Sequence, residues 1–238
     1  MHPTPDTVSI IIPTYNEAAH VGELLTYLRQ ASGDEVGIEL LVADGQSTDA
    51  TVALARQAGA KVVSCPRKGR AAQLNYGARA AAGQVLYFLH ADTRPPADFL
   101  AAIRRAVAQG AGSGCFRLAF DHAHWLLRLS GWATRFPTIF FRFGDQSLFV
   151  RRALFEQVGG YREELLLLED QEIVARLRRH GSFRILPGPI VTSARKYLDN
   201  GVVRLQSIFL LLCGLYQLGV SQPALVRVYR ALIRQDKI

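Results

Sequence analysis

Residues 8–17 are VSIIIPTYNE, a run of apolar, mostly β-branched residues that turns polar after Pro13. The apolar run from Val8 to Ile12 is short and ends at a proline, so it predicts a buried strand. A dinucleotide-binding fold would need a glycine-rich turn directly after this strand, and a P-loop protein would need its own glycine–lysine signature. The chain has PTYNE at this position and no P-loop elsewhere, which excludes the two commonest nucleotide-binding folds.

Strand and helix patterns alternate through the rest of the first half. Three further apolar runs have the length of buried strands, at residues 38–43, 61–64 and 85–89. Apolar residues at helical spacing follow the strands, and the expected helices cover residues 21–28, 47–57, 69–82 and 97–109. This alternation is typical of βαβ units, so we predict an α/β domain whose mostly parallel sheet has helices on both faces.

The second half is less regular, and its alternation loosens after Gly112. Strands are expected at residues 115–120 and 147–150, and helices at 171–180, 202–218 and 224–234. No repeat, low-complexity tract or linker interrupts the chain. We therefore expect residues 1–238 to form a single domain with two functional halves, 1–110 and 111–238.

Composition supports an ordinary globular domain. The 238 residues are 49% hydrophobic and 20% charged, which excludes intrinsic disorder. The three cysteines lie far apart without a CxxC pair, which argues against a disulfide framework and structural zinc and fits a reducing compartment. The N-terminus lacks the basic flank and long apolar run of a signal peptide, so we expect a cytoplasmic protein.

Charge is distributed unevenly along the chain. Residues 1–110 contain ten basic and ten acidic residues, whereas residues 111–238 contain eighteen basic and ten acidic residues. A basic half suggests an anionic partner such as phosphates or an acidic membrane surface, although a solvated basic face is an alternative. No nucleic-acid-binding motif is present, so we expect no nucleic-acid partner.

The apolar stretch 208–216 is too short to span a bilayer. It predicts a core helix, and the alternative is an interfacial helix that contacts the inner face of a membrane or a second copy in a homo-oligomer.

Each of the four expected parallel strands is followed by residues able to bind a ligand. These segments are Pro13–Glu17, Asp44–Asp49, Arg67–Arg70 and His90–Thr93. Ligands of parallel α/β sheets bind beyond the carboxyl ends of the strands, where these segments are expected to converge. A basic loop that opens onto a helix suits phosphate, and a carboxylate after a strand suits ribose hydroxyls or a divalent metal. Ser47 and Asp49 are more simply explained as helix caps or turn residues.

These motifs, together with Lys68-Gly-Arg70 and Glu169-Asp170, resemble the family 2 glycosyltransferases of GT-A fold in the correct order over residues 8–180. The resemblance implies a GT-A-type sheet followed by C-terminal helices. Residues 1–110 would then bind the nucleotide sugar, and residues 111–238 would bind the acceptor and carry the catalytic base. The segments 69–75, 89–93 and 144–146 look closer to a subgroup associated with radical-SAM genes and arsenosugar biosynthesis.

The resemblance also implies a donor pocket for a nucleotide sugar, with a UDP-sugar expected. Its contacts with base, ribose and diphosphate would come from Pro13, Tyr15, Glu17, Asp44, Arg70, Asn75 and Asp92. Asp92 matches the last carboxylate of the family's DxD motif and would hold Mg²⁺ or Mn²⁺ on the diphosphate. The first acid of that motif is His90 here, which is either a second metal ligand or a cap at the strand end.

The predicted catalytic residue is Asp170, which matches the base of the family's Glu-Asp pair and would deprotonate the acceptor in an inverting transfer. Glu169 would shape the acceptor site beside it, and Gln146 would lie in the acceptor pocket. Arg195 either closes over the phosphates from the basic half or lies in an exposed turn. The QxxRW signature and transmembrane helices of the processive members are both missing from the sequence. We therefore expect single transfers to a small or lipid-linked acceptor.

Overall fold

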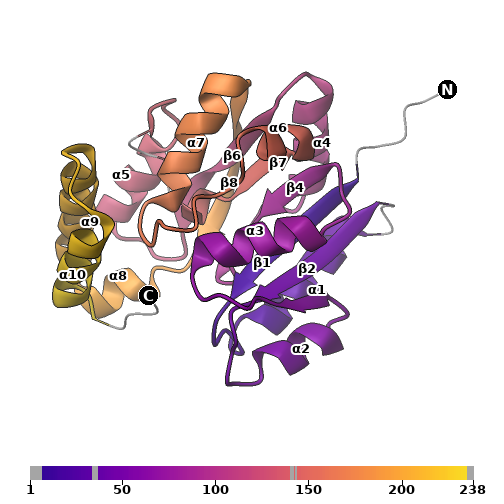
Figure 1. Cartoon of the computed structure of the whole chain (residues 1–238), viewed down its shortest axis with the longest axis horizontal. Helices are drawn as coiled ribbons and strands as arrows, with labels where there is room; N and C mark the ends of the chain where they lie inside the picture. Colours follow the sequence, from indigo (N-terminus) through magenta and orange to yellow (C-terminus); the bar gives the residue numbers. More distant parts are fainter. Residues whose placement is uncertain (1–6, 34–36, 140–141, 143, 235–238) are drawn as a thin grey trace.

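The computed structural model describes residues 7–33, 37–139, 142 and 144–234. Within this part of the chain, eight strands form one sheet in the order β3-β2-β1-β4-β7-β6-β8-β5 (Figure 1). The strands are β1 (Val8–Thr14), β2 (Ile38–Asp44), β3 (Lys61–Ser64), β4 (Val85–Phe88), β5 (Thr93–Arg94), β6 (Ser113–Phe120), β7 (Leu148–Arg151) and β8 (Phe183–Thr192). The first four are mutually parallel, as the alternating pattern predicts.

Helices cover both faces of the sheet (Figure 1). The helices are α1 (Val21–Ser32), α2 (Thr51–Gln57), α3 (Arg70–Ala80), α4 (Phe99–Ala108), α5 (Trp125–Ala133), α6 (Arg152–Gln157), α7 (Glu169–His180), α8 (Arg195–Asn200), α9 (Val202–Gln217) and α10 (Gln222–Leu232), with a 3₁₀ turn η2 (Gly144–Gln146) before β7. Buried side chains of α1 and α4 pack on one face, and those of α3, α6 and α7 pack on the other. The predicted α/β class is confirmed.

The second half of the sheet is mixed rather than parallel. β7 runs antiparallel to both β4 and β6, β8 is parallel to β6, and the two-residue β5 pairs antiparallel with β8. The sequence pattern predicts neither β5 nor β8. β5 is too short to show a period, and β8 contains Pro187 and Pro189, which weaken a strand signal and are tolerated beside its bulge.

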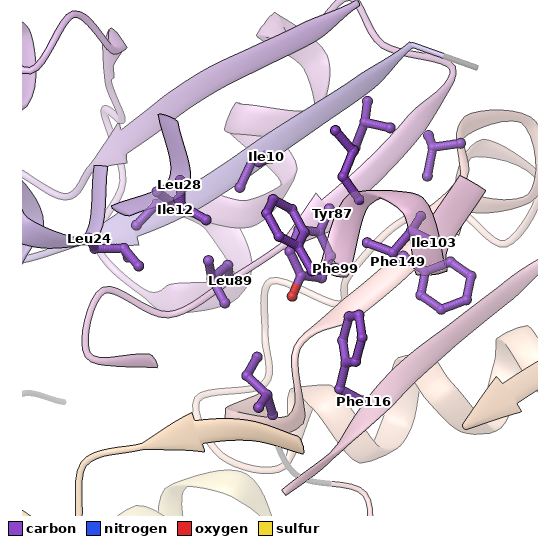
Figure 2. Close-up of a cluster of buried hydrophobic side chains, with 14 of the residues drawn as sticks. Ile10, Ile12, Leu24, Leu28, Tyr87, Leu89, Phe99, Ile103, Phe116 and Phe149 are labelled. Atoms are coloured by element: carbon purple, nitrogen blue, oxygen red, sulfur yellow. The ribbon is translucent and has the colours of Figure 1, made fainter. Parts of the chain in front are cut away.

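Aliphatic side chains make up most of the larger core between the sheet and α1 and α4, and aromatic rings meet within it (Figure 2). Tyr87 of β4 stacks on Phe99 of α4 with ring centroids 5.7 Å apart, and it meets the edge of Phe116 from β6 at 6.2 Å. Phe149 of β7 is buried in the same cluster. These contacts join the parallel and mixed parts of the sheet in one continuous core.

The C-terminal helices α9 and α10 form a hairpin with a small core of its own, which also includes Leu167. One side of α9 is buried and the other is exposed, so the stretch 208–216 is only partly a core helix. In the part of the chain that the structure describes, no helix combines the length and hydrophobicity needed to cross a membrane.

Close packing of α3 on the sheet depends on Gly77. A Cβ atom at this position would lie 2.5 Å from Cγ2 of Ile11 and 3.3 Å from Cβ of Ala43. Gly77→Ala should therefore lower the free energy of unfolding by about 1–3 kcal/mol, because the core must shift to admit one methyl group. Urea denaturation measures the effect.

Gly214 in α9 is the matched control, since nothing lies within 4 Å of a Cβ atom there. Gly214→Ala should raise the free energy of unfolding by about 0.5–1 kcal/mol through helix propensity alone. Equal effects at the two positions would contradict the packing explanation.

Candidate active site

The loops after β1 and β2 are joined by hydrogen bonds. The backbone N–H of Asn16 donates to Oγ of Ser47 over 2.9 Å, and the N–H of Thr48 donates to Oδ1 of Asn16 over 2.9 Å. Farther along, the N–H of Glu17 donates to Oγ1 of Thr51 over 2.8 Å. Asn16 has φ = 53°, a left-handed conformation that asparagine tolerates. The two loops therefore form one fixed rim that includes Tyr15.

Asp44 lies at the end of β2, is buried, and is held in one orientation. Its carboxylate accepts hydrogen bonds from Oγ1 of Thr14 (3.1 Å) and from both Oγ (2.6 Å) and the backbone N–H of Ser47 (3.0 Å). Ser47 thus connects Asp44 to the neighbouring loop, and it does not cap α2, whose first residue is Thr51. Asp49 accepts from the backbone N–H groups of both Thr51 and Ala18, so it joins the same loops.

A basic loop faces this rim. Nζ of Lys68 lies 5.4 Å from the ring centroid of Tyr15, a cation–π contact between the loops after β3 and β1. Gly69 has φ = 116°, which favours glycine, and it directly precedes Arg70, the first residue of α3. The predicted convergence of the first three strand-end loops is therefore present in the structure.

Arg70 connects the basic loop to an acidic centre, which we define as Asp145, Glu169 and Asp170. Nη1 of Arg70 lies 3.4 Å from Oε1 of Glu169. Burial would lower the pKa of Arg70, but the charges of Glu169, Asp170 and Asp145 together raise that pKa above its ordinary value. The guanidinium is consequently one of the positive charges that act on the acidic centre, together with His90 and Lys196.

Glu169 and Asp170 are the first two residues of α7. Glu169 is buried, and burial together with the adjacent Asp170 charge raises its pKa to about 7, against the lowering effect of Arg70. Burial also raises the pKa of the Asp170 carboxyl. Leu168 before them has φ = 63°, a strained conformation for a residue with a branched side chain. The two acids are thus placed by a locally strained chain and retain protons to a higher pH than exposed carboxyls.

His90, after β4, contacts the same centre. Its Nδ1 lies 3.2 Å from Oδ1 of Asp145, and this hydrogen bond and charge offset the effect of burial and raise the His90 pKa. A Cβ atom on Gly144 would lie 2.2 Å from Oδ2 of Asp170 and 2.8 Å from Cε1 of His90. Because Gly144 has no side chain, the Asp170 carboxylate and the His90 imidazole can both pack against its backbone.

Sequence reasoning did not place Asp145 in the site. Its position in Gly144-Asp-Gln146, where the resemblance predicts only Gln146 as a site residue, is the one local signal for it. Gln146 itself is buried beneath the site, and its Oε1 accepts from Nη1 of the buried Arg142 over 3.3 Å. It lines a small cavity together with His90 and Asp170.

Two other predicted residues are positioned differently from the strand-end loops. The amide of Asn75 is buried and exchanges hydrogen bonds with the main chain of Tyr161, 2.8 Å in each direction, and it also donates to Glu163. These contacts join α3 to the segment before α7. Arg195 starts α8, and its Nη1 lies 2.9 Å from Nε2 of His20 at the start of α1, so it reaches the segment that follows β1.

Asp92 follows β4 on the same rim. Its Oδ1 accepts a long hydrogen bond of 3.4 Å from Thr93, and its backbone oxygen accepts from the N–H of Ser193 over 3.3 Å. No group of three or more His, Cys, Asp and Glu residues that could hold a metal ion occurs among the described residues. Mg²⁺ and Mn²⁺ bound to a diphosphate need only one or two carboxylates beside phosphate oxygens and waters, so Asp92 fits such a metal.

A family comparison assigns the chain. The model of the glycosyl transferase family 2 matches residues 9–157, more than half of the sequence, including the loops of Asp44 and Asp92. The chain belongs to glycosyl transferase family 2. The predicted family and its GT-A-type fold are confirmed.

Individual relatives agree with this family. Glycosyltransferase AglJ of Haloferax volcanii is 49% identical over 61 residues, which cover 26% of this chain and 19% of AglJ. The mannosyltransferase PcManGT from Pyrobaculum calidifontis, in complex with GDP-Man and Mn²⁺, superposes with a TM-score of 0.69 at 20% identity, covering 95% of this chain and 70% of that one. S. aureus TarS in complex with UDP-GlcNAc gives a TM-score of 0.66 at 19% identity, with 79% and 58% covered. The chain thus matches only part of the length of AglJ and TarS.

The raised pKa of Glu169 predicts a pH-dependent stability. Since its folded-state pKa of about 7 exceeds the ordinary 4.5, the unfolded chain loses this proton first, and the free energy of unfolding falls as pH rises from about 4.5 to 7. Glu169→Gln keeps the shape of the protonated acid and removes the titration. Its stability relative to the native chain should therefore rise by about 3 kcal/mol between pH 5 and pH 8 in urea denaturation.

Glu156→Gln is the control, because its side chain is 65% exposed. Its effect on stability should be nearly the same at both pH values. A pH-independent difference for Glu169→Gln as well would show that Glu169 ionises normally in the folded protein.

Proposed function

We propose that this family 2 member transfers a sugar from a nucleoside-diphosphate donor, with a UDP-sugar expected, to an acceptor hydroxyl with inversion at the anomeric carbon. The observation that carries the proposal is the contact between Arg70 and Glu169. It links the basic loop, which faces the rim of Tyr15, to the pair of acids at the start of α7. A donor site and a candidate base therefore belong to one connected cluster.

The donor would bind across the strand-end loops. Pro13, Tyr15 and Glu17 would contact the base and ribose, and the fixed carboxylate of Asp44 would accept from the base or ribose. Arg70 and Arg195 would meet the diphosphate, which suits the basic loop and the start of α3. PcManGT with GDP-Man and TarS with UDP-GlcNAc support a nucleotide-sugar donor on this fold. Asn75 would act on this pocket through its contacts with Tyr161.

Asp170 would act as the general base. In the transfer, the acceptor hydroxyl gives its proton to the Asp170 carboxylate while its oxygen bonds to the anomeric carbon. The diphosphate leaves with the electron pair of the breaking C–O bond. Two adjacent carboxyl groups cannot both be ionised easily, so one of them keeps its proton. Glu169, whose pKa is about 7, would be the protonated member of the pair, and Asp170 would be the ionised one that can accept a proton.

A divalent cation, Mg²⁺ or Mn²⁺, would be held by Asp92 on the donor diphosphate. When bound, it would supply positive charge to the leaving group. His90 is a less suitable ligand through Nδ1, because that atom is hydrogen-bonded to Asp145; only Nε2 remains for this role. The complex of PcManGT with Mn²⁺ supports a metal in this fold.

The acceptor would be a small molecule or a lipid-linked one, received beside Glu169 and above Gln146. The likeness to the arsenosugar-associated subgroup stays a prediction about that acceptor. The assignment of donor binding to residues 1–110 and of acceptor binding and catalysis to residues 111–238 also stays a prediction, as does the cytoplasmic location.

Calorimetric titration with UDP tests the donor site. UDP should bind in the presence of Mn²⁺ and bind more weakly in EDTA, and Asp92→Ala should weaken binding about tenfold only when metal is present. Asp98→Ala, an exposed acid at the start of α4, is the matched control. Equal loss for Asp92→Ala in EDTA would mean a direct contact with the nucleotide. Binding of no nucleotide at all would favour a basic, non-catalytic module instead.

Asp170→Asn tests the base. The variant should lose transfer by about 10²–10⁴-fold in kcat, because an amide cannot accept the proton, while UDP binding stays within a few-fold. Donor-sugar hydrolysis and transfer are followed together by release of UDP. Turnover comparable to that of the native protein would remove Asp170 from the mechanism, and a ladder of product lengths would contradict single transfer.

A further inference from the structure

Helices α5 and α9 expose large apolar side chains to solvent. Trp125 is 66% exposed and Leu218 is 81% exposed, far above the values of core residues. We define the apolar face as the eight residues Trp125, Leu129, Trp132, Phe136, Val203, Leu210, Leu211 and Leu218. Single exposed apolar residues need no explanation, but a contiguous set marks an interaction surface.

The spacing of these residues places them on one side of each helix. Trp125, Leu129 and Trp132 are separated by four and three residues along α5, and Phe136 continues the same stripe. The exposed residues of α9 recur after seven and eight residues, which is also one side of a helix. The opposite sides of both helices are buried, because Leu127 of α5 and Val202 of α9 share a small core.

The charges carried by α5, α9 and α10 themselves have one sign, whereas the exposed acids Asp121 and Asp199 lie just before these segments. Residues 122–139 and 200–235 contain no aspartate or glutamate. Their charged residues other than histidine are arginines, namely Arg128, Arg135, Arg204, Arg227, Arg230 and Arg234. Arg128 and Arg135 flank the stripe of α5, and Arg135 stacks on Trp132 with a cation–π distance of 5.0 Å. The partner should therefore be both apolar and anionic.

This chemistry distinguishes among three classes of partner. A two-fold contact between copies of the chain would bring arginine-bearing helices together, and like charges oppose that contact. Nucleic acid would match the charge, but Leu210, Leu211 and Leu218 cannot stack on bases as aromatic residues do. An anionic lipid surface satisfies both features, since tryptophan and leucine enter the interfacial layer and arginines attract the headgroups.

We propose that the apolar face docks the protein on an anionic lipid bilayer. The proposal concerns a surface outside the catalytic cluster and does not depend on the identity of donor or acceptor. Figure 1 places α5, α9 and α10 at the end of the molecule away from β2 and α2. Docking at this end would therefore leave β2 and α2 uncovered.

The same hairpin is connected to the acids of α7. The side-chain amide of Gln222, at the start of α10, accepts from the N–H groups of Leu166 and Leu167 and donates to the carbonyl of Leu167 over 3.1 Å. Leu167 lies two residues before Glu169. The docking helices and the acidic centre consequently form one packed unit, so contact with a bilayer would set the orientation of the site relative to the lipid surface.

Co-sedimentation with vesicles tests the proposal. The native chain should bind vesicles that contain phosphatidylglycerol and bind vesicles of pure phosphatidylcholine at least tenfold more weakly, with binding to the anionic vesicles decreasing in salt. The double variant Trp132→Ser/Leu210→Ser should weaken binding to anionic vesicles about tenfold or more. Arg128→Gln/Arg204→Gln should do the same through charge.

The matched control is Arg56→Gln/Arg105→Gln, which removes the same charge from α2 and α4 and should bind like the native chain. Near-ultraviolet circular dichroism verifies the fold of every variant. If the control pair lost as much vesicle binding as Arg128→Gln/Arg204→Gln, the loss would depend on net charge alone, and the proposal would be overturned. Equal binding to neutral and anionic vesicles would also overturn the proposal. A third contradicting result would be a dimer in sedimentation velocity that Leu210→Ser dissociates, with no binding of the native chain to vesicles.

Discussion

The contact of the Arg70 guanidinium with the buried carboxylate of Glu169 is the interaction on which the rest of the site depends. Buried charges are costly unless they are paired, and Glu169 is nearly inaccessible. Pairing them requires the start of α3, the start of α7, the end of β4 and the turn before β7 to meet at one point. Four elements that are distant in sequence are thereby held at one place, and loss of the guanidinium would leave like charges facing one another.

Topology explains how residues of the second half reach that point. Ligand-binding residues of parallel strands lie at their carboxyl ends, but β7 is antiparallel to β4. The residues before β7 therefore lie at the same edge as the residues after β4, which brings Asp145 to His90. Because β7 is antiparallel to β4, both halves of the chain contribute residues to the same edge of the sheet without a long connecting loop.

The first half of the fold could be predicted because its strands are apolar runs of regular length with periodic helices between them. The loops that follow those strands could be predicted as a site for the same reason, since parallel strands share an edge. The contact of Asp145 with His90 spans 55 residues and has no local pattern. Asn75 was predicted from its motif, yet its contacts with Tyr161 depend on a partner 86 residues away. Pairings of this kind arise from packing, which residue spacing does not encode.

The pairing of β5 with β8 has a consequence for synthesis of the chain. Thr93 pairs with Thr192, and the backbone oxygen of Asp92 accepts from the N–H of Ser193. A ribosome delivers the chain from its N-terminus, so β1 to β4 can assemble long before their last partner emerges. The loop of Asp92 gains its final support only when residue 193 has left the exit tunnel. A nascent chain would thus complete this sheet only after β8 has emerged, well after the strands of its first half.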